Sequence, residues 1–193
     1  MKIILLVCLF ITFKGISQDT LVAKINSEKL EYDSLIYQSQ QEELDFYPPK
    51  FVITSTLMER AIGEVSSTTE LFFDVIENEE YDRDSCLLRQ VKVTIESGSY
   101  LIAKTYFFNA LGDLIYYQIH EEGYDCWEQT YYFDNICIYK TQKALPTENC
   151  NLDVIAETFS KSTLSLSEIE FTNSILKTSN QYKNQLRLMY NMR

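Results

Sequence analysis

Apolar and polar side chains alternate most regularly in the middle of the chain. Residues 87–95 place Val91 and Val93 on one side of an extended strand, and Lys92 and Thr94 on the other. This two-residue period is typical of a β-strand that buries one face. The same alternation recurs in the segments that follow, so we expect several such strands in succession.

Turn residues predict how these strands pair. A two-residue turn at 97–98 would pair Ile95 with Tyr100, and a four-residue loop after the next strand would set Tyr106 opposite Ile115. The apolar faces of three strands then agree across two independent turns. This agreement is stronger evidence than the assignment of any single strand.

Two further turns extend the sheet to five strands. We expect a three-residue loop at 121–123 and a tight turn at 134–135, which join strands over 125–133 and 136–141. Connections this short predict an antiparallel meander, with its core at about residues 86–143. The face that continues the core then carries Trp127, Tyr131, Phe133, Ile136 and Ile138.

Helical patterns precede the meander. Residues 27–46 have the apolar spacing of a helix, which would end before Pro48-Pro49. Residues 51–62 mix strand-forming and helix-forming side chains. We interpret them as a short helix, followed by a strand near 71–75.

Helical spacing returns in the C-terminal part. Residues 152–159 suggest one short helix, and Ser165 with Glu168 matches a capping box. The helix that follows, over 168–190, would pack on the sheet or extend as a surface arm. The expected fold class is therefore α+β: an antiparallel β-meander of about five to six strands flanked by N-terminal and C-terminal helices.

The N-terminus has the three parts of a secretory signal peptide. Lys2 precedes an apolar run at 3–13, and Gly15 and Ser17 put small residues before a cleavage site. A membrane anchor is the alternative, but this run of 11 residues is short of the roughly 20 that a spanning helix needs. We expect a signal peptide over 1–17 and export to the periplasm or the cell exterior. The mature chain would be a single domain with no membrane span.

The charge balance excludes two classes of partner. The chain has 17 basic and 28 acidic residues, a net charge of −11, and loss of Lys2 and Lys14 with the signal peptide would make it −13. Nucleic acids and anionic membrane surfaces both attract basic patches. We therefore expect neither as a partner, and the acidic balance favours solubility.

Four cysteines remain once Cys8 leaves with the signal peptide. An even count in an exported chain suggests disulfides, and the alternative is four small buried apolar side chains. In an up-and-down meander Cys126 lies near the end from which the last strand leaves, so we expect a Cys126–Cys150 disulfide. Cys86 and Cys137 would lie near the opposite end and could join only if the sheet curls strongly or if they lie on adjacent strands. No C-x-x-C spacing is present, so no structural metal is expected.

Other candidate sites have plainer interpretations. His120 lies beside Glu121 and Glu122, which could ligate a metal, but a polar loop at the end of a hairpin is the simpler reading. The acidic run at 77–84 could bind calcium, but it lacks the order of an EF-hand and fits a solvated loop. No nucleophile motif accompanies the single histidine, so we expect no cofactor and no nucleophilic hydrolysis. Paired carboxylates acting on glycosidic bonds remain an alternative.

The second face of the sheet is also aromatic. In the predicted register it carries Phe107, Tyr116, Tyr132 and Tyr139, together with Leu101, Ala103 and Leu114. One interpretation is a second covering layer, with the two terminal helices on opposite faces. The other is a binding surface for a carbohydrate, a peptide or a partner protein, because tyrosine combines an apolar ring with a polar tip.

One hairpin carries a family resemblance. Tyr106-x-Phe108-Asn109-x-x-Gly112-x-Leu114 is similar to the hairpin unit of YD-type repeats and MORN-like bacterial modules, and 131–134 form a shorter second copy without the glycine. With its signal peptide the chain resembles uncharacterised small secreted bacterial proteins that carry paired Tyr-Tyr-Phe hairpins between helices. The resemblance implies an antiparallel meander and no catalytic residue.

These observations predict an exported, non-enzymatic binding or scaffold protein. Its partner would be an envelope or extracellular protein or a glycan, and the aromatic face of the sheet is the candidate surface for it. The alternative is a hydrolase that acts on envelope material through two carboxylates, one of which would have a raised pKa.

Overall fold

The computed structural model describes most of the chain. The described segments are 2–41, 48–59, 63–76, 85–123, 127–134, 136–144, 159–160 and 165–191. They form the helix α1 (Lys2–Gln41), the strands β1 (Lys50–Glu59), β2 (Gly63–Ile76), β3 (Ser85–Ser97), β4 (Tyr100–Phe108), β5 (Leu114–Glu122), β6 (Trp127–Asp134), β7 (Ile136–Ala144) and β8 (Phe159–Ser160), and the helix α2 (Leu166–Asn191).

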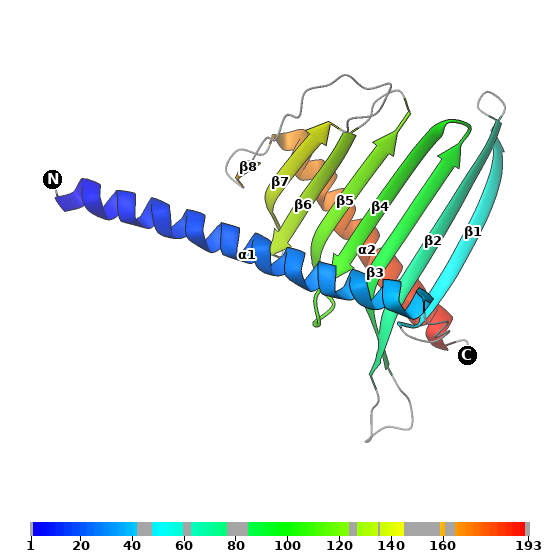
Figure 1. The fold of residues 1–193 in the computed structure, drawn as a ribbon. Coiled ribbons are helices and arrows are strands. Elements are labelled where there is room, and N and C mark those ends of the chain that lie inside the picture. Colours follow the sequence, from blue (N-terminus) through cyan, green and yellow to red (C-terminus); the bar gives the residue numbers. More distant parts are fainter. Residues whose placement is uncertain are drawn as a thin grey trace.

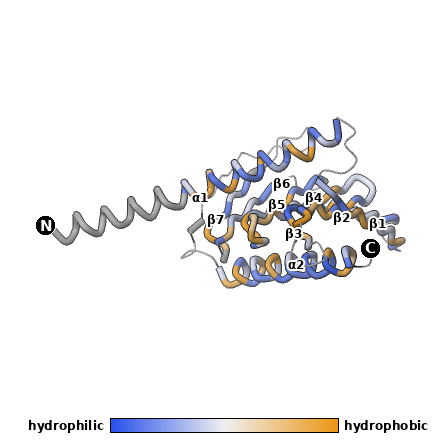
Figure 2. The backbone as a smooth tube through the Cα atoms, turned by 90° about the horizontal axis from the view of Figure 1, so that it is seen from below, coloured by the Kyte–Doolittle hydropathy of each residue, from blue (hydrophilic) through white to orange (hydrophobic). Residues whose placement is uncertain are grey.

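The strands form one antiparallel sheet. Its eight strands lie in the order β1 to β8, so each strand pairs with its neighbour in the sequence. The predicted meander is confirmed. It is longer than expected because β1 precedes it, the strand expected near 71–75 is the fourteen-residue β2, and β8 follows it. The two helices lie on opposite faces: Figure 2 shows the sheet between them, and Figure 1 shows α1 crossing the strands obliquely. The α+β class follows from this arrangement.

The main core lies between the sheet and α2. Ile175 and Leu186 of α2 are buried there among strand residues such as Leu71, Val91 and Tyr131. Aromatic rings continue the contact along the helix: Phe171 packs on Tyr131, Tyr182 on Tyr106 and Tyr190 on Phe73. The C-terminal helix therefore packs on the sheet and is not a free arm.

The capping box of α2 is confirmed. The Ser165 hydroxyl accepts a hydrogen bond from the Glu168 amide at 3.3 Å, and the Glu168 carboxylate accepts one from the Ser165 amide at 2.9 Å. These reciprocal bonds satisfy two backbone donors that the helix cannot satisfy itself. The hydrogen bond from the Ser165 amide lowers the pKa of Glu168 and burial raises it, but the Ser165 hydroxyl and Lys140 lower it further, so the net pKa lies below its ordinary value.

The segment that follows Pro49 is a strand, so the short helix expected over 51–62 is wrong. Val52, Ile53 and Thr54 favour extended backbone, and β1 pairs with β2 from Lys50 opposite Phe72 to Glu59 opposite Gly63. This ladder satisfies backbone groups that a helix would leave open at the edge of β2. Tertiary pairing thus outweighs the helix-forming residues at the end of the segment. Residues 60–62 lie outside the described segments.

Two hairpin registers differ from prediction by an even number of residues. The β3–β4 turn uses Gly98-Ser99, so Ile95 lies opposite Ile102. Tyr106 lies opposite Tyr117. A shift by two residues leaves every side chain on its expected face, so the prediction of two apolar faces survives both errors.

β-bulges change the face of a few side chains. Irregularities near Phe107 and Tyr132 place Leu114 in the α2-side core and turn Ile115 and Ile138 toward α1, opposite to expectation. An extra residue on one strand of a pair breaks the alternation locally. The sequence pattern cannot show these positions because it assumes an unbroken two-residue period.

Other boundaries also differ. α1 begins at Lys2, well before the expected start of that helix, and residues 42–46 of the predicted helix lie outside the described segments. Most of the short helix expected over 152–159 also lies outside them, and Phe159 belongs to β8.

Candidate binding site at helix α1

The four aromatic residues proposed for binding lie in one row beneath α1. Phe107 is fully buried, Tyr116 and Tyr132 are nearly so, and Tyr139 is partly buried. Neighbouring rings touch: the centroids of Tyr116 and Tyr132 are 5.5 Å apart, as are those of Tyr132 and Tyr139. The structure therefore brings the predicted residues together and covers them with a helix.

The residues of α1 that cover this row are few. Ile25, Tyr32 and Ile36 are buried against it, with Leu21 and Val22 partly buried, and the Tyr32 ring lies 5.8 Å from Phe107. Their spacing places them on one stripe of the helix. The first of the two interpretations of the second face, a covering layer, is therefore what the structure shows.

Polar side chains also hold α1 on the sheet. The Tyr132 hydroxyl donates to the side-chain oxygen of Asn26 at 3.0 Å, and the Tyr32 hydroxyl donates to Asp74 at 3.5 Å. The amide nitrogen of Gln90 donates to Asp33 at 2.9 Å. The contact between α1 and the sheet is therefore mixed, whereas the core beneath α2 is predominantly apolar and aromatic.

Asp33 is the centre of this polar contact. Lys29 lies one helical turn before it, and Lys92 on β3 approaches its carboxylate at 3.5 Å. Burial pushes the pKa of Asp33 upward, but the hydrogen bonds from Lys29 and Gln90 and the charges of both lysines outweigh burial and lower it. The carboxylate is thus ionised and fixed between helix and sheet.

Gln90 has one half of its amide satisfied. Its side chain is fully buried, and its nitrogen bonds Asp33, but its oxygen has no hydrogen-bond partner among the described residues. An unmade hydrogen bond at a buried oxygen costs stability. The unsatisfied oxygen of Gln90 therefore offsets part of the stability that hydrogen bonds and ion pairs give to the contact between α1 and the sheet.

Arg89 joins the aromatic row to the surface. Its guanidinium forms an ion pair with Asp74 at 2.7 Å, and Nε donates to the carbonyl of Phe108 at 3.3 Å. The same group lies over the rings of Tyr32 and Phe107, at 5.1 and 6.0 Å from their centroids. Cation–π contact and ion pairing together hold it firmly.

A β-bulge aims Arg89 at this face. Phe72 lies opposite Gln90, and Phe73 lies opposite Leu88, so Arg89 is the extra residue between two regular pairs. The bulge turns it toward α1, where strict alternation would turn it away. Sequence reasoning missed Arg89 for this reason, and it missed Asp33 and Asn26 because their partners lie far away in the chain.

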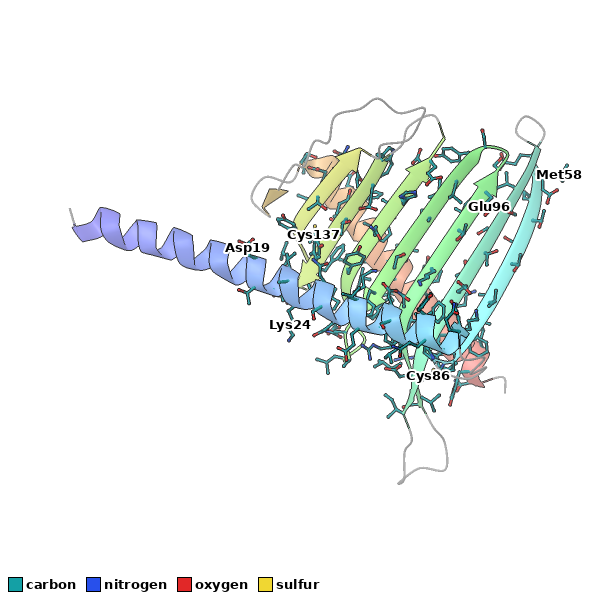
Figure 3. All side chains as sticks on the ribbon, in the orientation of Figure 1. Asp19, Lys24, Met58, Cys86, Glu96 and Cys137 are labelled. Carbon is teal, nitrogen blue, oxygen red and sulfur yellow. The ribbon has the colours of Figure 1, made fainter. Side chains whose placement is uncertain are left out.

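A groove opens where α1 passes the β4–β5 turn. We call it the α1 groove; its volume is about 450 Å³, and it is lined by Lys24, Glu28, Glu31, Tyr32, Leu35, Asp74, Arg89, Asn109, Ala110 and Leu111. A smaller cavity of about 160 Å³ adjoins it and shares Lys24, Glu28 and Asn109. Figure 3 shows Lys24 beside this part of the sheet. The groove combines acidic, aromatic and apolar walls with two cations, the partly buried Arg89 and the exposed Lys24.

The turn at the groove is built by the residues of the hairpin motif. The side-chain oxygen of Asn109 accepts from the amides of Leu111 and Asp113, both at 2.9 Å, and Gly112 has a φ of +80°. These bonds fix the loop that presents Leu111, which is 83% exposed. The asparagine and glycine of the motif therefore form a turn and carry no chemistry of their own.

The other candidates are placed as follows. His120 pairs with Glu122 at 2.7 Å and approaches Glu128 at 3.9 Å. Among the described residues no three potential ligands gather into a metal site. The acidic run at 77–84 lies outside the described segments. Among the described carboxyls, Asp33 and Glu168 have lowered pKa values, whereas a glycosidase acid needs a raised one.

The cysteines divide into two groups. Cys86 on β3 and Cys137 on β7 are free thiols, and Figure 3 shows them on well-separated strands. Burial raises the pKa of both, and that of Cys137 rises to about 11. Cys126 and Cys150, the predicted disulfide, lie outside the described segments.

Comparisons with protein-family models, curated proteins and solved structures found no match to this chain. Neither helix, over the part of the chain that the structure describes, has an apolar stretch long enough to cross a membrane. The α1 groove and the residues around it are therefore the features that bear on function.

Proposed function

We propose that the protein is an exported, non-enzymatic binding or scaffold protein, and that the α1 groove holds its partner. The observation that carries this proposal is the placement of Arg89. A bulge turns this cation onto the aromatic row, and it forms the floor of a groove of about 450 Å³. Binding sites of roughly 300–1,000 Å³ with a few fixed polar groups are typical of proteins.

The groove walls favour a protein segment with apolar and basic side chains. Leu35 and Leu111 supply exposed apolar surface, and Glu28 and Glu31 supply carboxylates at the rim. No ion pair joins Glu31 to another described residue, so its charge is available to a partner cation. The acidic balance of the whole chain would steer such a segment toward it.

A glycan fits the same walls less well. Sugars bind on the face of an exposed aromatic ring, but Tyr32 is only 6% exposed and its ring faces Phe107 and Arg89. We therefore favour an envelope or extracellular protein over a glycan as the partner.

Affinity capture on envelope extract tests the proposal. The mature chain, residues 18–193, is immobilised as wild type, as Glu31→Lys and as Leu111→Asp, and retained proteins are identified by mass spectrometry. We expect the wild type to retain a specific protein that both variants lose. Glu96→Lys is the matched control, because Glu96 is also exposed and lies on β3 away from the α1 groove (Figure 3).

Two outcomes would contradict the proposal. Equal retention by all four chains would move the binding site away from the groove. Retention of envelope glycan in place of protein, lost again in Glu31→Lys, would keep the site and change the class of partner.

A further inference from the structure

The outer edge of β1 is open. β1 is the terminal strand of the sheet, and among the described residues it pairs only with β2 (Figure 1). A terminal strand presents a row of backbone N–H and C=O groups that can pair with another strand. At the opposite end the sheet finishes with β8, which has two residues, so β1 is the long edge.

This edge lacks the usual protection. Residues 51–58 contain no charged side chain and no proline, and the β1–β2 register runs its full length without a bulge. Val52, Leu57 and Met58 are 50%, 61% and 73% exposed, and Figure 3 shows Met58 near the end of the strand. Natural proteins commonly guard such an edge with lysine, proline or a bulge, or cover it.

We infer that β1 pairs with β1 of a second copy of this chain, antiparallel and centred on Ser55, to form a homodimer with one continuous sheet. Two-fold symmetry would relate the two copies. A two-fold axis perpendicular to the sheet keeps the α1 face of both copies on the same side. Each residue then lies opposite a residue whose side chain points to the same face, so odd positions pair with odd and even with even.

Centring on Ser55 makes the side chains of β1 complementary to themselves. Val52 lies opposite Met58 of the second copy on the α1 side, and Ile53 lies opposite Leu57 on the α2 side. Thr54 lies opposite Thr56 between them, so over residues 52–58 hydroxyl meets hydroxyl and apolar meets apolar; at the ends of the strand Phe51 lies opposite Glu59. Cross-strand pairs of these kinds stabilise a sheet.

Neighbouring registers match the side chains less well. Centring on Thr54 places Met58 opposite Lys50 and Ile53 opposite Ser55. Centring on Thr56 places Ile53 opposite the carboxylate of Glu59. Only the register centred on Ser55 gives each of the three exposed apolar residues an apolar partner.

The first experiment measures oligomeric state. Light scattering coupled to size-exclusion chromatography is run on the mature chain over a wide dilution series. Pairing through a single strand buries modest area, so we expect a dimer that dissociates on dilution. Leu57→Lys should shift it to monomer. Leu188→Lys on α2 is the matched control, since Leu188 is 68% exposed and belongs to the helix, not to the β1 edge.

The second experiment measures register. Ser55→Cys places two thiols on the two-fold axis, where paired Cα atoms about 4.5–5.5 Å apart permit a disulfide. We expect a covalent dimer on oxidation, judged against the wild type on a non-reducing gel. Ser174→Cys on α2 should add no such band. Thr54→Cys should cross-link best when mixed with Thr56→Cys.

Each result decides the inference. The inferred β1–β1 pairing is supported if Leu57→Lys abolishes the dimer, Leu188→Lys keeps it, and Ser55→Cys forms the cross-link. A monomer at every concentration overturns it, as does a dimer that survives Leu57→Lys. A dimer in which Thr54→Cys cross-links alone and Ser55→Cys does not would overturn the register. Circular dichroism confirms that each variant is folded.

Discussion

The hydroxyl of Tyr132 on β6 donates a hydrogen bond of 3.0 Å to the side-chain oxygen of Asn26 on α1, across 106 residues of chain. This bond ties the helix to the middle of the aromatic row. It also gives a buried tyrosine the partner that its hydroxyl needs. The row is therefore a second core as much as a candidate binding face.

Removing that hydroxyl should weaken the docking of α1. Tyr132→Phe keeps the ring and its contacts with Tyr116 and Tyr139 but loses the bond to Asn26. We expect the free energy of unfolding to fall by about 0.5–1.5 kcal/mol, because Asn26 is exposed and returns to water. Urea denaturation measures it. Tyr37→Phe, at an exposed tyrosine of α1, should change nothing; an equal loss in both variants would contradict the role of this bond.

Low pH should weaken the contact between α1 and the sheet. The pKa of Asp33 is lowered in the folded protein, so the unfolded chain binds its proton first as pH falls. The contribution is fully present above the unfolded value of about 3.9 and is lost as pH falls through the lower folded value. Denaturation of wild type and Asp33→Asn at several pH values measures it. The difference between the two chains should shrink below pH ~4.

The carboxyl of Glu168 also has a lowered pKa. It is common to both chains, so comparing the two isolates the contribution of Asp33. A stability difference between wild type and Asp33→Asn that does not change with pH would contradict the ionised contact.

The sequence predicts those parts of the fold that obey a single period. β3 to β7 are predicted because each keeps the alternation over part of its length, away from the bulges, and Ser165 with Glu168 caps α2 as expected. The strand β1 is missed because its last residues favour a helix in isolation, and only pairing with β2 makes it extended.

The candidate site divides along the same line. The four aromatic residues are found because register errors of two residues preserve the face of a strand. Arg89 is missed, and Leu114 and Ile138 are predicted on the wrong face, because a bulge adds one residue without changing local composition. Asp33 and Gln90 are 57 residues apart in the sequence and come into contact only when α1 packs on the sheet. No local pattern in either segment predicts this hydrogen bond.

The glycine of the β4–β5 turn should be hard to replace. Gly112 has a φ of +80°, and a Cβ there would lie 2.9 Å from Cδ1 of Leu87. Gly112→Ala adds that collision to a left-handed backbone cost of about 1–2 kcal/mol. Gly98→Ala is the matched control, since Gly98 has a φ of +60° with nothing within 4 Å of the added carbon. We expect a larger drop in Tm for Gly112→Ala, and equal drops would show that Leu87 moves aside freely.

The cap of α2 should contribute measurably to stability. Ser165→Ala removes the hydroxyl that accepts from the Glu168 amide. We expect a loss of about 1 kcal/mol in the free energy of unfolding, because the first-turn amide loses its partner. Ser34→Ala, at an exposed serine inside α1, should be neutral or slightly stabilising, since alanine favours helix. A neutral Ser165→Ala would mean that water replaces the cap.

The thiols of Cys86 and Cys137 should be unreactive in the folded protein. The pKa of Cys137 rises to about 11 through burial, with smaller effects from the Tyr139 carbonyl, Lys140 and Glu168. At pH ~8 about one thiol in a thousand is then ionised, and the thiolate is the reactive form. Alkylation of the native mature chain followed by peptide mass spectrometry should leave Cys137 unmodified and Cys86 slow to react. Both should label fully in denaturant, and rapid native labelling of Cys137 would contradict its burial.

The same peptides, left unreduced, test the predicted Cys126–Cys150 disulfide, which four free thiols would disprove.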